Sequence, residues 1–178
     1  MPTWVLYAML AVCFWGAWGM VSKLAADSIP PLLNQLLSTV GLVPPAVVAL
    51  WQVRRAWKRK GLCLSLAAGI AGGFGNLCFL AALTHGGQVS IVAPLAAVYP
   101  LITVLLAWIV LQEKVQRQQL VGVALAIAAI VFLNREGSVV GTSLEGSSRW
   151  LTLTIAALFL YGVSALFQKL ATNVIAAE

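Results

Sequence analysis

Residues 150–175 read WLTLTIAALFLYGVSALFQKLATNVI, and they repeat residues 4–29, WVLYAMLAVCFWGAWGMVSKLAADSI, when the two are laid together without gaps. Seven of the 26 places are identical, against about two or three expected by chance for so apolar a composition. Both copies carry Trp at the start, an aromatic–glycine pair in the middle and Lys-Leu-Ala near the end. The chain therefore contains one full repeat and opens a second. The identical pairs are Trp4/Trp150, Ala11/Ala157, Gly16/Gly162, Lys23/Lys169, Leu24/Leu170, Ala25/Ala171 and Ile29/Ile175.

The composition indicates that this fold forms in a lipid bilayer. Hydrophobic residues make up 61% of the 178 residues and charged residues only 9%, whereas soluble domains have about half and about a quarter. Apolar stretches that approach the length needed to cross about 30 Å of hydrocarbon as a helix recur along the chain. We predict an all-α integral membrane protein, a bundle of six transmembrane helices. The predicted spans are residues 4–22, 32–53, 62–83, 89–111, 118–134 and 150–171.

The basic residues orient the predicted helices. Seven Lys or Arg residues lie in the loops after the second and fourth spans, five of them in RRAWKRK at residues 54–60, and only Arg135 and Arg149 lie in the opposite loops. Loops rich in basic residues stay in the cytoplasm, so both termini are expected there. The 54–60 cluster would also suit anionic lipid headgroups, but orientation alone accounts for it. No nucleic-acid partner is expected.

The number of predicted spans makes the repeat an inverted one. The first and sixth predicted spans are five crossings apart, an odd number, so the two copies run through the membrane in opposite directions. Inverted repeats are a common construction of secondary transporters, because two copies facing opposite ways expose one central site alternately. The sequence therefore favours transport over other functions.

Two segments carry a resemblance to a known family. FWGAWGMVSK at residues 14–23 and APLAAVYPLITVLLAWIVLQEKVQRQQLVG at residues 93–122, with the basic loop after the second span, resemble the EamA branch of the drug/metabolite transporter superfamily. The resemblance implies the first half of a 5+5 inverted-repeat transporter with an EmrE-like fold, in a bacterial cytoplasmic (inner) membrane. It implies residues 1–135 as a five-helix repeat, 136–149 as an external linker and 150–178 as the first helix of a second repeat.

The chain departs from the family that it resembles mainly in its length, because such carriers have ten spans and only six are predicted here. We expect a partial product of a ten-span carrier that does not transport alone, with the second repeat supplied in cis or by a split partner. The implied function is export of a small metabolite, such as an amino acid or related compound, by alternating access. A lipid-linked or drug flippase or exporter of the same superfamily is the alternative.

Aromatic residues and a glycine in mid-span are candidate substrate contacts. Gly16 lies twelve residues after Trp4, about 18 Å along a helix, so Trp15 and Gly16 are expected near the bilayer centre. Trp15 and Trp18 share a helix face and would form an aromatic wall for an apolar or cationic ligand. Tyr161 stands in the place of Trp15 in the second copy. Gly16 would equally seat a neighbouring helix.

Polar side chains within the spans add further candidates. Asn76 is the most polar residue at the depth of the third predicted span. An amide in hydrocarbon is costly unless it is hydrogen-bonded, so Asn76 either bridges helices or faces a wet cavity and contacts substrate. Tyr99 is either a cavity-lining hydroxyl or a packing residue. Asn34 and Gln35, near the start of the second span, are expected at the interface.

Prolines predict bends in the second and fourth spans. Each proline removes a backbone donor and frees a carbonyl in the preceding turn. The predicted hinge or kink residues are Pro44, Pro45, Pro94 and Pro100.

Lys23 lies nineteen residues after Trp4. Along a helix this distance is about the thickness of the hydrocarbon, so Lys23 and its counterpart Lys169 are predicted to be snorkelling anchors at the membrane interface.

Other function classes are disfavoured. Cys13, Cys63 and Cys78 have no paired spacing, which argues against a disulfide framework and a zinc site. No Asp or Glu lies well inside a predicted span, so this half offers no carboxylate for proton coupling. An intramembrane enzyme would need paired carboxylates, a metal cluster or a Ser–His pair, and the single histidine, His85, falls in a predicted external loop. We expect no catalysis, no metal and no cofactor; the expected partners are the lipid bilayer and an unidentified small substrate.

Overall fold

The computed structural model describes residues 3–53, 59–112, 121–122, 124–125, 128 and 149–176. Nearly all of the predicted fifth span and of the predicted linker lie outside these residues. The described part is helical, without a strand. Its helices are α1 (Thr3–Ala26), α2 (Pro31–Gly41), α3 (Val43–Val53), α4 (Arg59–Thr84), α5 (Val89–Ala96), α6 (Tyr99–Leu111) and α8 (Arg149–Ala176).

Five helical segments among the described residues are long and apolar enough to cross a membrane. The predicted all-α membrane class is therefore confirmed, while the count of six remains a prediction because the fifth predicted span is not described. Two of the five segments join two helices each, α2 with α3 and α5 with α6. The five segments are Val5–Ala26, Pro31–Val48, Arg59–Thr84, Val89–Leu111 and Arg149–Val174.

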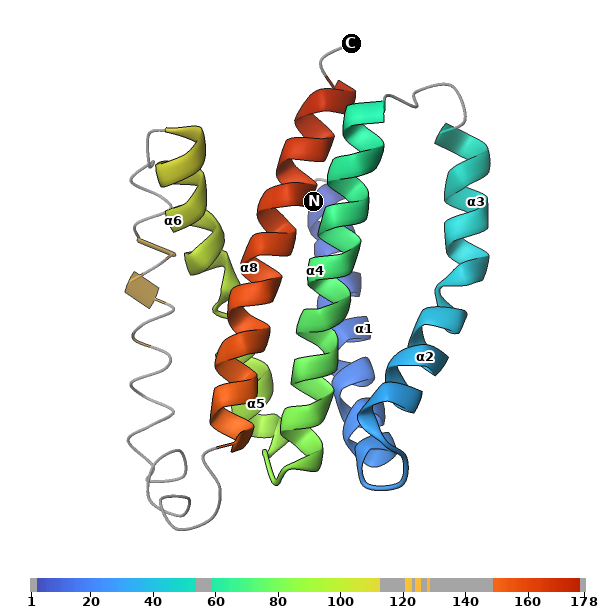
Figure 1. Cartoon of the computed structure of the whole chain (residues 1–178), viewed down its shortest axis with the longest axis vertical. Helices are drawn as coiled ribbons and strands as arrows, with labels where there is room; N and C mark the ends of the chain where they lie inside the picture. The colour runs from blue at the N-terminus through green and yellow to red at the C-terminus, as the bar shows by residue number, and fades with distance from the viewer. Residues whose placement is uncertain are drawn as a thin grey trace.

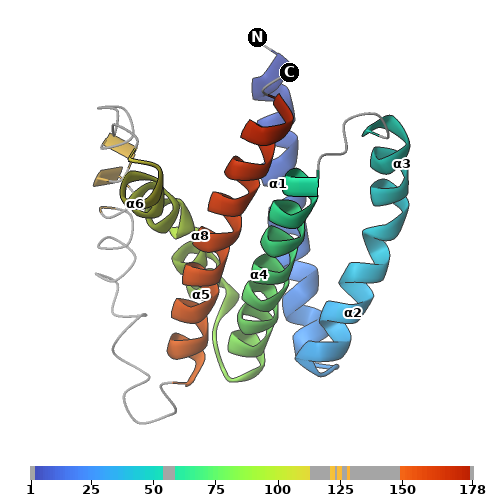
Figure 2. The same ribbon diagram turned by 45° about the horizontal axis from the view of Figure 1, so that its top comes forward.

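Helices α4 and α8 lie side by side at the centre of the bundle and run in opposite directions (Figures 1 and 2). Small residues hold them close: a Cβ built on Gly75 would lie 3.0 Å from Cδ1 of Tyr161. The buried hydroxyl of Ser164 donates to the backbone oxygen of Ala68 over 2.8 Å. Close backbone approach and interhelical hydrogen bonds are what hold helices together in lipid, where hydrophobic burial gives no advantage.

Helices α1 and α8, which carry the two copies of the repeat, run in opposite directions, so that the start of α1 and the end of α8 lie at the same end of the bundle (Figure 2). α1 packs against α4 mainly through its C-terminal half. There Ser22 is 3% exposed, and Trp18 stacks on Phe79 of α4 with ring centroids 5.6 Å apart. The N-terminal half of α1 is open, since Tyr7 is 70% and Trp15 65% exposed.

Two of the membrane-crossing segments are broken near prolines. α2 ends at Gly41, and α3 begins at Val43, so the break at Leu42 lies two residues before the Pro44–Pro45 pair. α5 contains Pro94 and ends at Ala96, and α6 begins at Tyr99 with Pro100 in its first turn, where a missing N–H is tolerated. The figures show both segments bent (Figures 1 and 2). Hinge motion at these prolines stays a prediction.

The turn between α4 and α5 depends on two glycines. Gly86 has a backbone φ of +93°, which only glycine adopts without strain. A Cβ on Gly87 would lie 2.6 Å from the backbone oxygen of Ala82, and the Gly87 N–H donates to that same oxygen over 2.9 Å. The tight turn brings α5 back against α4, where Leu80, Leu83 and Val92 are among the largest fully buried side chains.

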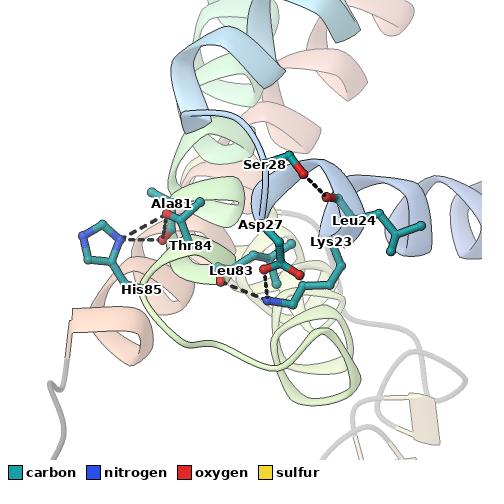
Figure 3. Close-up of polar contacts among 8 residues, drawn as sticks. All are labelled: Lys23, Leu24, Asp27, Ser28, Ala81, Leu83, Thr84 and His85. Carbon is teal, nitrogen blue, oxygen red and sulfur yellow. Dashed lines mark hydrogen bonds and ion pairs between the residues drawn. The ribbon is translucent and has the colours of Figure 1, made fainter.

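Lys23 joins the end of α1 to the end of α4 (Figure 3). Its Nζ donates to Oδ1 of Asp27 over 2.8 Å and to the backbone oxygen of Leu83 over 3.5 Å. A lysine beside the last carbonyls of a helix completes their hydrogen bonding and balances the helix dipole. In the same region, Nδ1 of His85 lies 2.8 Å from the backbone oxygen of Ala81. Lys23 thus links two helices, while its role as a membrane anchor stays a prediction.

Candidate functional site

Four helices contribute side chains to one polar cluster inside the apolar bundle. Gln35 comes from α2, Asn76 from α4, Tyr99 from α6 and Tyr161 from α8. Asn76 Nδ2 donates to Oε1 of Gln35, and the hydroxyl of Tyr161 donates to Oδ1 of Asn76 over 3.1 Å. The rings of Tyr99 and Tyr161 meet edge to face, with centroids 6.0 Å apart and an interplanar angle of 61°. We call these four residues the amide–tyrosine cluster.

Asn76 is the centre of this cluster. A carboxamide has two N–H donors and an oxygen with two acceptor sites. Within the described part of the chain, Asn76 uses one donor for Gln35 and one acceptor site for Tyr161. Half of its hydrogen-bonding capacity therefore remains for a ligand or water. Such spare polar capacity is expensive in a membrane, which is why mid-membrane polar groups generally mark a pathway or a binding site.

Tyr161 lies halfway along its membrane-crossing segment, twelve residues after Arg149 and thirteen before Val174. Each distance is about 18–20 Å along a helix. Its neighbour Gly162 lets α6 approach closely, because a Cβ there would lie 2.6 Å from Ile102. Tyr161 therefore lies near the middle of the bundle.

The hydroxyl of Thr103 links α6 to α8 beside the cluster. The hydroxyl of Thr103 lies 3.2 Å from the backbone oxygens of both Gly162 and Tyr99 and donates to them. Because α6 is short and follows the break after α5, this contact sets the position of the Tyr99 ring. The polar side of the site thus depends on α8, the helix from the second copy of the repeat.

The structure brings together three of the residues that the sequence singled out, Asn76, Tyr99 and Tyr161. It places the others elsewhere. Trp15 is 65% exposed, and nothing lies within 4 Å of a Cβ built on Gly16. Trp18 stacks on Phe79 and so contributes to the α1–α4 contact. The predicted aromatic wall of Trp15 and Trp18 does not line this cluster, and substrate contact by any of these residues stays a prediction.

Gln35 is the residue of the cluster that sequence reasoning missed, since it was expected at the interface. It bonds Asn76 across two helices, and its Nε2 also donates to the hydroxyl of Thr39 over 3.4 Å. The signal in the sequence was the spacing: Gln35 and Thr39 are polar residues four apart, on one face of an apolar helix. Neighbouring Asn34 is only 6% exposed, and its Nδ2 has no partner among the described residues.

The chemistry of the cluster is neutral and suited to binding. Amides and phenols supply donors and acceptors without a fixed charge, and aromatic faces accept apolar or cationic groups. Among the described residues there is no group of three His, Cys, Asp or Glu side chains that would hold a metal ion. The four side chains of the cluster provide donors, acceptors and aromatic faces of the kind that a small polar solute would contact, and they include no nucleophile–base pair of the kind that catalysis requires.

Comparisons with known proteins agree with a transporter. Residues 2–135 match the model of the EamA-like transporter family. A protein of Salmonella typhimurium (strain LT2) named "Probable amino-acid metabolite efflux pump" is 31% identical over 163 residues, which are 91% of this chain and 52% of that protein. The chain thus spans about half the length of this relative. No solved structure gives a significant match.

Proposed function

Because this chain belongs to the EamA-like transporter family, we propose that it forms part of a ten-span carrier that exports a small metabolite by alternating access. The relative's name points to an amino acid or a related compound as cargo. The observation that carries the proposal is the amide–tyrosine cluster, in which Asn76 on α4 bonds Gln35 of α2 and Tyr161 of α8, and the Tyr161 ring contacts Tyr99 of α6. Transport, without catalysis, is what such a neutral polar cluster supports.

The cluster binds the polar part of the cargo in this proposal. The carboxamide of Asn76 donates to a carboxylate and accepts from an ammonium group, so it suits both ends of an amino acid. The rings of Tyr99 and Tyr161 contact its side chain. Because no carboxylate lies in a predicted span, recognition in this half does not depend on a fixed negative charge.

The two broken helices supply the movement. Gln35 lies on α2 before the break at Leu42, and Tyr99 lies at the start of α6 after the break that follows α5. Tilting of either segment would change its distance from Asn76 on the continuous helix α4. Helix breaks at membrane depth are typical of sites where transporters bind and release their cargo.

We also propose that the second repeat is supplied in cis or by a split partner, and that this chain alone does not transport. In a bacterial cytoplasmic membrane both termini would lie in the cytoplasm, as the basic loops predict. Labelling tests this topology: cysteines placed at Lys23 and Lys169 should react with a membrane-impermeant maleimide from opposite sides. Reaction of both from one side would contradict the inverted arrangement.

Flux measurements test the function itself. Proteoliposomes with the purified chain alone should show no flux of labelled amino acids, whereas those with the chain plus its second repeat should. In the complete carrier, Asn76→Leu should raise KM for the cargo by tenfold or more, since about 1.4 kcal/mol of binding is lost with two hydrogen bonds. Ser65→Ala, an exposed change on the same helix, should leave KM unchanged.

The flippase alternative makes a different prediction. A lipid-linked cargo would leave amino-acid flux absent in the complete carrier and would move a fluorescent lipid between leaflets instead. A thermal-shift screen against amino acids, nucleosides and cationic drugs separates the remaining cargo classes. Stabilisation by amino acids that disappears in Asn76→Leu would support the proposed site.

A further inference from the structure

The side of α2 that faces the bundle is polar. Leucines cover the opposite side, and each of them is at least 44% exposed. The residues of α2 that are not exposed follow one another at spacings of three, one and three, so they lie on one side of the helix. These residues are Pro31, Asn34, Gln35 and Ser38. α2 therefore meets its neighbours α1 and α4 through mostly polar side chains.

Asn34 is the residue of this side that packing does not explain. Polar side chains inside a membrane bundle either hold helices together by hydrogen bonds or line a path for polar molecules. Gln35 does the first, because it accepts a hydrogen bond from Asn76 of α4. Asn34 is only 6% exposed, yet its Nδ2 has no hydrogen-bond partner among the described residues. A buried donor without an acceptor destabilises the fold, so this amide points to a ligand.

Asn34 adjoins the amide–tyrosine cluster. Its Cα lies about 3.8 Å from that of Gln35, which bonds Asn76 directly. α2 begins at the end of the bundle where α1 and α4 end (Figures 1 and 2). Because Asn34 comes one residue before Gln35, it lies on the side of the cluster toward that end. A small ligand could therefore contact Asn34 and the cluster together.

The two places differ in the groups that they offer. Nδ2 of Asn34 is a donor, so a ligand there must supply an acceptor. A carboxylate does so through charge-assisted bonds, which are about twice as strong as neutral ones. The cluster offers acceptors: Oδ1 of Asn76 has one acceptor site left beside its bond from Tyr161, and the phenol oxygen of Tyr161 also accepts while it donates. An ammonium group suits these acceptors.

We propose that Asn34 is a second cargo contact, which binds the carboxylate of an amino acid while the amide–tyrosine cluster binds its ammonium group. These two groups are attached to one carbon of an α-amino acid, as the closeness of the two places requires. The contact rests on the proposed function for its ligand, and it adds the orientation of the cargo, with the carboxylate toward the end of the bundle where α1 and α4 end. Asn34 thereby selects amino acids over amines with the same side chain.

Thermal unfolding of the chain alone tests whether the Asn34 amide has a structural partner. Asn34→Leu removes the buried donor and keeps a side chain of similar size, so the unfolding temperature should rise by about 3 °C or more. Asn173→Leu makes the same change at an exposed position of α8 and should shift the temperature by no more than about 1 °C. An unchanged or lower temperature in Asn34→Leu would show that the amide is satisfied in the free chain, and would overturn the proposal.

Binding to the complete carrier tests the ligand. The probes are alanine, leucine and phenylalanine, each compared with the amine that lacks its carboxylate, namely ethylamine, isoamylamine and phenethylamine. Titration of the unfolding temperature with each probe gives its affinity, and the amines are also measured by competition with the amino acids. Asn173→Leu again serves as the matched control.

Asn34→Leu should weaken binding of the amino acids by about tenfold or more, since a charge-assisted hydrogen bond is lost. The same variant should change the affinity for the amines by less than about twofold, because they make no bond to Asn34. Asn76→Leu should weaken both classes, since the ammonium group is common to them. Asn173→Leu should change neither.

Equal losses for the amino acids and their amines in Asn34→Leu would overturn the proposal, because Asn34 would then not face the carboxylate. A wild-type carrier that binds none of the three amino acids would overturn it as well. The proposed function fails separately. Carboxylate-dependent binding without flux would contradict transport and leave the Asn34 contact in place, whereas flux with an unchanged KM in Asn34→Leu would leave transport in place and overturn the contact.

Discussion

The hydroxyl of Tyr161 donates to the side-chain oxygen of Asn76 over 3.1 Å, across 85 residues of sequence. One partner lies on α4, and the other on α8, whose sequence repeats that of α1. The bond therefore joins α4 to α8 at the candidate site. In the carrier that we propose, the two halves must meet at the cargo, and this pair would supply such a meeting point.

Tyr161→Phe should weaken this junction without changing its packing. The change removes one hydrogen bond and leaves the ring in place, so the expected loss of unfolding free energy is about 0.6–1 kcal/mol, as for other interhelical bonds in membranes. Thermal unfolding in detergent measures it. Tyr7→Phe on the exposed part of α1 is the control, and a loss there of equal size would show that the hydrogen bond is not responsible.

Gly75→Ala should separate α4 from α8. The added Cβ would lie 3.0 Å from Tyr161 Cδ1 and 3.3 Å from Leu160, and the Tyr161 ring is held by its bond to Asn76. We expect a destabilisation of about 1–2 kcal/mol, typical of overpacking, measured by thermal unfolding. The edge-to-face contact between Tyr99 and Tyr161 should weaken as well.

Gly73→Ala is the matched control for that prediction. It lies on the same helix two residues away, and nothing lies within 4 Å of its Cβ. Alanine is the better helix former by about 0.5–1 kcal/mol, so this variant should be neutral or slightly more stable. If both variants lowered the unfolding temperature alike, close approach of α8 would not be the cause.

The membrane class and the family could be predicted from the sequence, because composition and local sequence patterns can be read without knowing which helices pack together. Long apolar stretches must form helices in a membrane, and residues 93–122 carry the sequence pattern that resembles the EamA family. The helix breaks lie next to prolines, where missing backbone donors predict a bend.

The composition of the site was harder to read, because it depends on which helix faces meet. Asn76 was visible as an isolated amide in an apolar span, but its partner Gln35 lies near a span start, where polar residues are common. Trp15 and Tyr161 occupy equivalent places in the repeat, yet only Tyr161 lies beside Asn76. Equivalent places in the sequence repeat therefore did not predict equivalent surroundings for these two side chains.

Gly87→Ala should disturb the turn that returns the chain from α4 to α5. The new Cβ would lie 2.6 Å from the Ala82 backbone oxygen and 2.7 Å from Val92, and a backbone atom cannot be moved aside as a flexible side chain can. We expect a loss of about 2 kcal/mol, measured by thermal unfolding. Gly41→Ala, whose Cβ meets nothing within 4 Å, should cost far less, and similar losses in both would contradict the role of the turn.

Lys23 and Asp27 make an ion pair of 2.8 Å at the end of α1, but only Lys23 also reaches α4, at the Leu83 oxygen. Asp27→Asn should therefore cost only a few tenths of a kcal/mol, because an exposed ion pair is largely screened. Lys23→Met should cost more, about 0.5–1 kcal/mol, since it also removes the cation beside the last carbonyls of α4. Unfolding in detergent at low and high salt measures both variants. The loss of unfolding free energy in Lys23→Met should shrink with salt but remain the larger of the two. An equal loss in Asp27→Asn would show that the ion pair, and not the contact with α4, stabilises this end of the bundle.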